Sequence, residues 1–148
     1  MVLWRISNYA DLQGRGGLVS SGRWHTRGHP AVYLAETPAG ALIEALVHLE
    51  LNEADLPPGY QLLKVNVPAN VKTEKCNPAT LGETWMVNTE ITRRVGDEWL
   101  RRRSALLLRV PSAIVPETWN WVLDPSHPQA RRIRISWARR YEWDARSR

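Results

Sequence analysis

Proline and glycine recur along the whole chain, and they limit how far any helix or strand can run. The 148 residues include ten prolines and nine glycines. Between these breaks, segments of strand-like composition are interspersed with segments of helical periodicity, without a clear strand–helix–strand repeat. The sequence therefore predicts a mixed α/β fold of many short elements, in a single compact domain that spans residues 1–148.

Two segments carry helical signals. Thr37 is placed to cap a helix whose first residue is Pro38, and the apolar stretch that follows predicts a helix to about Leu51. A second helix is predicted over Glu90–Arg103, where apolar side chains recur at every fourth position. Gly96 lies inside this second segment and lowers its helical propensity.

Four segments have the composition of strands. They are Ala31–Glu36, Tyr60–Val67, Ala105–Val110, which Pro111 is expected to end, and Arg132–Trp137. In the first of them, alternation places Val32 and Leu34 on one face and Tyr33 on the opposite face. The stretches 14–30 and 68–89 are predicted to be irregular.

Charge is distributed unevenly along the chain. Residues 1–90 carry 7 basic and 9 acidic side chains, whereas residues 91–148 carry 13 basic and 6 acidic ones, and all 13 are arginine. Arginine binds phosphates and carboxylates through paired hydrogen bonds. The C-terminal part is therefore predicted to meet a phosphorylated ligand, a nucleic acid or an acidic partner, unless it forms a solvated basic face.

Several classes of protein are disfavoured by what the sequence lacks. No apolar run reaches the ~20 residues of a membrane-spanning helix, and the N-terminal residues do not resemble a secretory signal. Cys76 is the only cysteine, which excludes an internal disulfide and a cysteine-rich zinc site, and we expect a cytoplasmic protein. The glycines form neither a dinucleotide-binding nor a P-loop pattern, G-x-S-x-G is absent, and the histidine spacing predicts no metal site.

Glu44 is the most informative anomaly, because this carboxylate lies inside the otherwise apolar stretch ALIEALVHL. Burying a carboxylate is unfavourable unless it is paired or used. His48 lies four residues on and therefore on the same helical face. The pattern leaves two interpretations open: a structural pair of Glu44 with a histidine or arginine, or a functional carboxylate held on a rigid helix beside His48.

Three more side chains stand in positions suited to ligand binding. Arg23 lies in a glycine-rich loop, where backbone can approach a ligand closely and arginine can hold a pyrophosphate. Tyr33 can stack on an aromatic ligand or donate its hydroxyl, and Ser112 follows the end of a strand. Taken singly, each also has a structural interpretation: Arg23 as an exposed loop residue, Tyr33 as part of the core, and Ser112 as a turn residue. His25 and His29 are expected to decorate their loop.

Taken in order, several segments resemble the RES-domain toxins of bacterial toxin–antitoxin systems, a family named for an arginine, a glutamate and a serine. The matching segments are Gly22-Arg23-Trp24, GHPAVYLA (28–35), ALIE (41–44) with Val47-His48, RVGDEWL (94–100), VPSAIVPE (110–117), Asn120 and DPSHP (124–128). Two positions depart from the family pattern, which often has asparagine in place of His25 and Asn-Pro in place of Asp124-Pro125.

The resemblance implies a fold similar to that of ADP-ribosyltransferase toxins, with NAD⁺ as the substrate rather than a resident cofactor. RES-domain toxins are described as degrading NAD⁺ by hydrolysis or phosphorolysis, or as ADP-ribosylating, so the acceptor of the ADP-ribose stays open. The resemblance also implies an antitoxin partner with an Xre-type helix-turn-helix domain that blocks the active site. DNA would then be contacted only through that antitoxin, in a hetero-oligomeric cytoplasmic complex without membrane contact.

The resemblance also assigns residues to the site. The catalytic set is Arg23, Tyr33 and Glu44, and the NAD⁺-binding set is Arg23, Tyr33, His48, Ser112 and Asn120. Cleavage of the nicotinamide–ribose bond builds positive charge on the ribose, which a fixed carboxylate such as Glu44 stabilises.

The other members of the set are expected to contact the substrate. Arg23 would hold the phosphates or ribose, and Tyr33 would stack on the nicotinamide end. Ser112 and Asn120 would hydrogen-bond the ribose or carboxamide, and His48 would orient Glu44 or contact the ligand. An alternative from another class, a basic RNA- or DNA-binding module or a ribonuclease, rests on the C-terminal arginines and the eight tryptophans.

Overall fold

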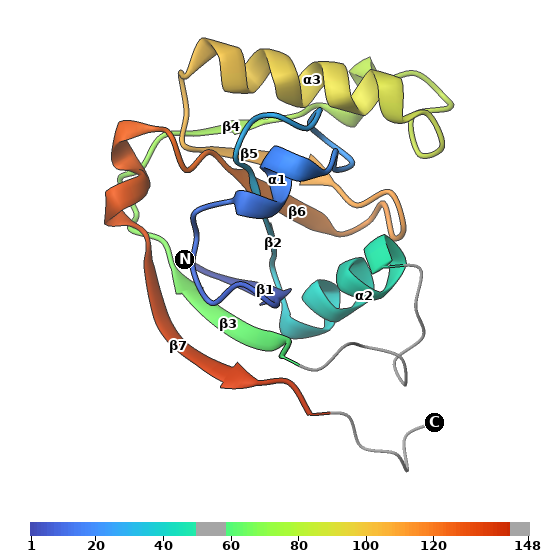
Figure 1. The fold of residues 1–148 in the computed structure, drawn as a ribbon. Helices are drawn as coiled ribbons and strands as arrows, with labels where there is room; N and C mark the ends of the chain where they lie inside the picture. The colour runs from blue at the N-terminus through green and yellow to red at the C-terminus, as the bar shows by residue number, and fades with distance from the viewer. Residues whose placement is uncertain (50–58, 143–148) are drawn as a thin grey trace.

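The computed structural model describes residues 1–49 and 59–142 and confirms the mixed α/β fold (Figure 1). Its elements are β1 (Val2–Ser7), α1 (Arg15–Val19), β2 (Val32–Ala35), α2 (Pro38–Leu49), β3 (Gln61–Asn66), β4 (Thr73–Lys75), η2 (Pro78–Thr80), α3 (Thr89–Arg102), β5 (Leu107–Pro111), β6 (Trp119–Leu123), η3 (Pro128–Arg132) and β7 (Arg134–Arg140). The strands form one sheet in the order β4-β5-β6-β2-β1-β3-β7. Strands β4 and β5 run parallel, and the other neighbours are antiparallel.

The two halves of the sheet are joined over a very short stretch, which lets them fold toward each other. Strands β1 and β2 meet through the single register pair Trp4↔Ala35, whereas β1 and β3 are paired along their whole length. The main buried cluster takes side chains from both halves, including Leu3, Leu63, Val65, Leu34, Leu107 and Leu123. Burial of this apolar surface holds the halves at a fixed angle.

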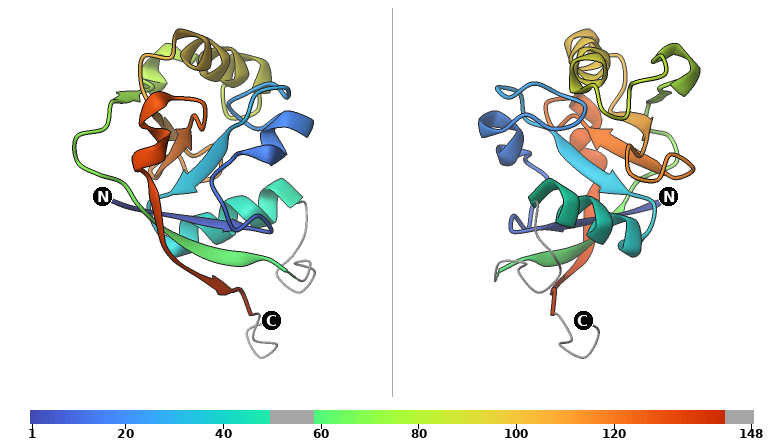
Figure 2. Two further views of the ribbon diagram at one scale, coloured as in Figure 1. Left: turned by 60° about the vertical axis from the view of Figure 1, so that its left-hand side comes forward. Right: turned by 90° about the vertical axis from the view of Figure 1, so that its right-hand side faces the viewer.

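Two helices cover different parts of the sheet, and α1 lies between them (Figures 1 and 2). Helix α3 packs on β5 and β6 through Trp99 and Leu100, which share a buried cluster with Leu108, Val110 and Val122. Helix α2 contacts β1 and β2. Within residues 1–49 and 59–142, no helix is long and apolar enough to cross a membrane.

Most of the predicted elements are confirmed, with shifted ends. Helix α2 ends at Leu49, and the predicted continuation to Leu51 lies outside the described residues. Strand β5 includes Pro111, contrary to the prediction, because a proline at a strand end interrupts no further ladder bond. Strand β7 starts at Arg134 and reaches Arg140, later than predicted, because residues 128–132 form a 3₁₀ turn capped by the His127 side chain.

Besides the 3₁₀ turns η2 and η3, four elements have no counterpart in the sequence prediction. Helix α1 and strand β4 are shorter than any periodicity can reveal, and they fall in stretches predicted to be irregular. Strand β6 lies inside the sheet between β5 and β2, and its sequence WNWVL does not alternate. Strand β1 carries Arg5 between apolar residues, and that arginine becomes important at the site.

Candidate functional site

A cavity of about 640 Å³ lies between α1, α2 and the loop that follows α1. Five of the six residues singled out from the sequence line it, namely Arg23, Tyr33, Glu44, His48 and Asn120. The sixth, Ser112, is buried and contacts Glu44. The structure therefore brings the whole set together around one cavity.

Glu44 is held by the side chains of Ser112 and Asn120. Its Oε1 accepts hydrogen bonds from Ser112 Oγ at 2.7 Å and from Asn120 Nδ2 at 2.8 Å. Ser112 Oγ itself accepts from the backbone N–H groups of Ile114 and Val115, so its one proton is directed at Glu44. These bonds fix the position of the carboxylate.

This arrangement differs from what the sequence led us to expect for three residues. Ser112 and Asn120 bind Glu44 in the structure, where ligand contacts were expected, and only Asn120 also lines the cavity. His48 lines the cavity on the exposed side of α2, and in the described part of the chain it forms no hydrogen bond with Glu44. The described residues therefore show no pairing of Glu44 with His48, and contact of His48 with the ligand stays a prediction.

The hydroxyl of Tyr33 forms hydrogen bonds within the protein. It accepts a hydrogen bond from the N–H of Trp24 at 3.0 Å and lies 2.7 Å from Nδ1 of His25. Nε2 of His25 lies 3.2 Å from the carbonyl oxygen of Gly17, which can only accept. Nε2 therefore carries the proton, and Nδ1 accepts the Tyr33 proton. Burial raises the pKa of Tyr33, so its hydroxyl stays protonated.

His25 is thus a buried anchor for Tyr33, and the expectation that it decorates a loop is wrong, because its side chain is only 2% exposed. The loop that carries Arg23 also packs against the Tyr33 ring at Gly22, where an added Cβ would lie 2.6 Å from Tyr33 Cζ. Asp124, the other departure from the family pattern, is also buried, and its Oδ1 accepts from the N–H of Ser126.

The buried His25 predicts a pH-dependent stability. Burial lowers its pKa in the folded protein below the ordinary value of 6.5, so on acidification the unfolded chain takes up a proton first. We expect the free energy of unfolding to fall as the pH drops through about 6.5, until the folded-state pKa is reached. Urea unfolding between pH 5 and 8 measures this. The His25→Asn variant should show a flatter dependence, and equal slopes for both proteins would contradict the assignment.

Helix α3 holds the loop that carries Arg23. Thr92 Oγ1 donates to the carbonyl of Arg23 at 2.5 Å, and Arg93 Nε donates to the carbonyl of Gly22 at 2.9 Å. The Asp97 carboxylate accepts from the N–H and hydroxyl of Thr26 at 2.8 and 2.7 Å. Together these bonds fix both ends of the loop segment 22–26 on one helix.

Gly96 explains how α3 can pack directly against the backbone of the loop that carries Arg23. A Cβ at this position would overlap the carbonyl oxygen of Trp24 and lie 2.6 Å from its carbonyl carbon. The residue that weakens the helix in the sequence is therefore the one that lets the Arg23 loop lie directly on it. With its backbone fixed, Arg23 donates from Nη1 to the carbonyl of Met86 at 3.0 Å and lines the cavity.

Arg5 is a site residue that the sequence reasoning missed. Its guanidinium donates to the carbonyl of Tyr33 at 3.2 Å and to Ser7 Oγ at 3.3 Å. Its Nε is buried and has no hydrogen-bond partner among residues 1–49 and 59–142. Burial lowers the pKa of Arg5 to about 10, which still leaves the group charged at neutral pH. The available signal was an arginine inside the strand-like run VLWRIS.

The charged side chains that line the cavity are mostly arginines, with one glutamate among them. Among the described residues that line it, the arginines are Arg5, Arg23 and Arg93, and the only carboxylate is Glu44. Such a cavity suits an anionic ligand that develops positive charge at one atom. In the described part of the chain, no three histidine, cysteine, aspartate or glutamate side chains are grouped as metal ligands.

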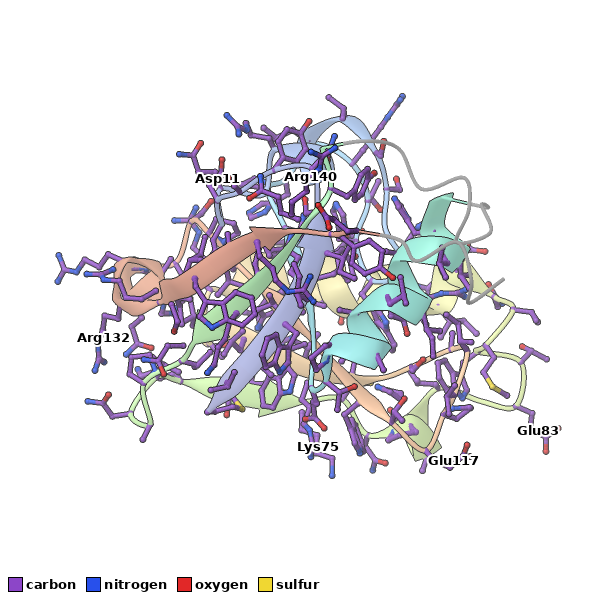
Figure 3. The ribbon with its side chains drawn as sticks, turned by 90° about the horizontal axis from the view of Figure 1, so that it is seen from below. Asp11, Lys75, Glu83, Glu117, Arg132 and Arg140 are labelled. Atoms are coloured by element: carbon purple, nitrogen blue, oxygen red, sulfur yellow. The ribbon has the colours of Figure 1, made fainter. Side chains whose placement is uncertain are left out.

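The C-terminal arginines are mostly elsewhere. Of the described arginines after residue 90, only Arg93 lines the cavity. A group of five lies on η3 and β7, where Figure 3 labels Arg132 and Arg140 near the two ends of the strand. Most of the described C-terminal arginines therefore do not line the cavity.

Comparison with known proteins identifies the family. The model of the RES domain family matches residues 2–144. The chain is 50% identical to a Pseudomonas putida protein called "Toxin Res", covering 91% of this chain and 92% of that one. It is 36% identical to the "Prs ADP-ribosylating toxin" of a Sphingobium species, covering 97% and 94%.

A solved structure shares the fold. It is the Mycobacterium tuberculosis MbcT–MbcA toxin–antitoxin complex, one chain of which superposes with a TM-score of 0.77 at 17% identity, covering 95% of this chain and 83% of that chain. The ordered motifs, the site that they build and the family match over nearly the whole chain agree, and the protein belongs to the RES domain family.

Proposed function

We propose that this protein is the toxin of a toxin–antitoxin pair and that it cleaves the nicotinamide–ribose bond of NAD⁺. The observation that carries the proposal is Glu44, held by Ser112 and Asn120 at a cavity that three arginines also line. NAD⁺ presents two negative phosphates and a positively charged nicotinamide ring, which matches that charge pattern.

The chemistry requires little beyond a fixed negative charge. Nicotinamide leaves as a neutral molecule, so no strong acid is needed, and the ribose acquires positive charge as the bond breaks. The Glu44 carboxylate, fixed through Oε1, would stabilise that charge without having to reorganise. Arg23 would hold the phosphates, and the Tyr33 ring would pack beside the nicotinamide, its hydroxyl being bound by Trp24 and His25.

The acceptor of the ADP-ribose defines a second candidate. The Sphingobium relative carries a name that specifies ADP-ribosylation. If this chain acts in the same way, a protein side chain replaces water or phosphate, while the bond that breaks and the roles of the site residues stay the same. The two activities differ only in where the ADP-ribose is found afterwards.

The surroundings of the cavity support an antitoxin partner. Exposed apolar side chains from α1, α2 and the loop after β5 line it, namely Val19, Val47 and Ile114. Exposed apolar groups around a cavity are typical of a protein-binding surface. We propose that an antitoxin with an Xre-type DNA-binding domain covers this surface in a hetero-oligomeric cytoplasmic complex, and that DNA is contacted only through the antitoxin.

The direct test is nicotinamide release by the purified protein. Incubated with NAD⁺, it should release nicotinamide and form ADP-ribose in plain buffer or a phosphorylated ADP-ribose in phosphate buffer. If a protein is the acceptor, labelled NAD⁺ should mark a band only when cell lysate is added. Induced expression should also lower the NAD⁺ content of the cell. Growth arrest with unchanged NAD⁺, and no nicotinamide released under any of these conditions, would refute the proposal.

A further inference from the structure

Arg93 combines a structural bond with a position at the wall of the cavity. Its Nε donates to the carbonyl of Gly22, and the residue lines the cavity. Neither terminal nitrogen has a hydrogen-bond or ion-pair partner within residues 1–49 and 59–142. A guanidinium oriented through Nε keeps its two Nη groups available for a planar anion.

Arg93 forms no ion pair with any of the described residues. Asp97, one turn further along α3, is the residue that would normally pair with it, but both its oxygens are bound to Thr26. The next arginine behaves differently, because Arg94 lies 3.9 Å from Glu90 and does not line the cavity. The helix thus carries one arginine paired with an exposed glutamate and, next to it, one whose only bond among the described residues is to the Gly22 carbonyl.

The position of Arg93 relative to Arg23 indicates which ligand group the two would share. Arg93 binds the residue next to Arg23, and the charges of both arginines act on the Tyr33 hydroxyl. Thr89, one turn before Arg93, also lines the cavity, so the positive end of the α3 dipole adds to the same region.

We propose that Arg93 binds the pyrophosphate of the dinucleotide through its terminal nitrogens, as a second cationic arm beside Arg23. This inference rests on the proposed function and specifies how the cavity would distinguish a dinucleotide from a nicotinamide compound without phosphates. Arg93 has no bond to Glu44, so its contribution lies in binding and falls on KM more than on kcat.

The test compares Arg93→Gln with the matched control Arg94→Gln. Steady-state kinetics should show a KM for NAD⁺ about ten- to a hundredfold higher for Arg93→Gln, a smaller change in kcat, and no change for Arg94→Gln. Calorimetry should show a similar loss of affinity for ADP-ribose, which has the pyrophosphate, and none for nicotinamide riboside, which lacks it.

A third variant separates ligand binding from the bond to Gly22. Arg93→Lys keeps the charge but loses the Nε donor, so it should retain most of the affinity for ADP-ribose. If Arg93 only holds the loop, both variants weaken ADP-ribose and nicotinamide riboside alike, and the inference fails. If the parent protein neither cleaves NAD⁺ nor binds ADP-ribose, the proposed function fails first.

Discussion

Replacing Glu44 with glutamine is expected to lower the rate of nicotinamide release about a thousandfold, because the amide carries no charge to stabilise the ribose cation. The side chain keeps its shape, and its Oε1 can still accept from Ser112 and Asn120. The loss should therefore fall on kcat and kcat/KM together, with the KM for NAD⁺ little changed.

The matched control for this variant is Glu36→Gln. Glu36 is also bound by two neighbouring side chains, Arg109 and Trp121, but it does not line the cavity. Its ion pair is partly exposed, so its loss should lower stability by less than ~1 kcal/mol and leave the rate unchanged. Retention of more than a tenth of the parent rate by a folded Glu44→Gln protein would remove Glu44 from the reaction.

Glu44 shows what sequence reasoning can find at such a site. A carboxylate inside an apolar helix is anomalous on burial grounds alone, and that anomaly led to a residue that lines the cavity in the structure. Its partners could not be found in the same way. Helical spacing suggested His48, whereas Ser112 and Asn120 come from a loop and a strand about 70 residues away. Only the sheet order, which places β6 beside β2, brings them within reach.

Arg5 and His25 show more clearly what sequence patterns cannot predict. Their side chains look ordinary along the chain, one on a strand and one in a loop. The structure makes them important through what covers them, since Arg5 bonds to the backbone of Tyr33 and His25 to its hydroxyl. Burial is a property of the assembled fold, so no local pattern could have predicted that both support the same tyrosine.

Gly96 lowers helix propensity in the sequence but is required for close packing in the structure. In an isolated helix, alanine would be more stable than glycine by about 1 kcal/mol. Here the added methyl group would overlap the Trp24 carbonyl, and backbone on both sides leaves no flexible side chain to give way. Relief requires α3 to move away from the loop that it holds through Thr92, Arg93 and Asp97.

Gly96→Ala should therefore destabilise the protein by about 3 kcal/mol, which lowers the unfolding temperature by about 6–12 °C for a chain of this size. The control is Gly16→Ala in α1, where the new methyl would meet only Tyr9 Cε2 at 3.9 Å. That variant should unfold at or slightly above the parent temperature, because it restricts the unfolded chain without an overlap. Calorimetric scans of the three proteins measure both effects. Equal unfolding temperatures for the two variants would show that the contact between α3 and the Arg23 loop is looser than described, and with it the fixed placement of Arg23 at the cavity.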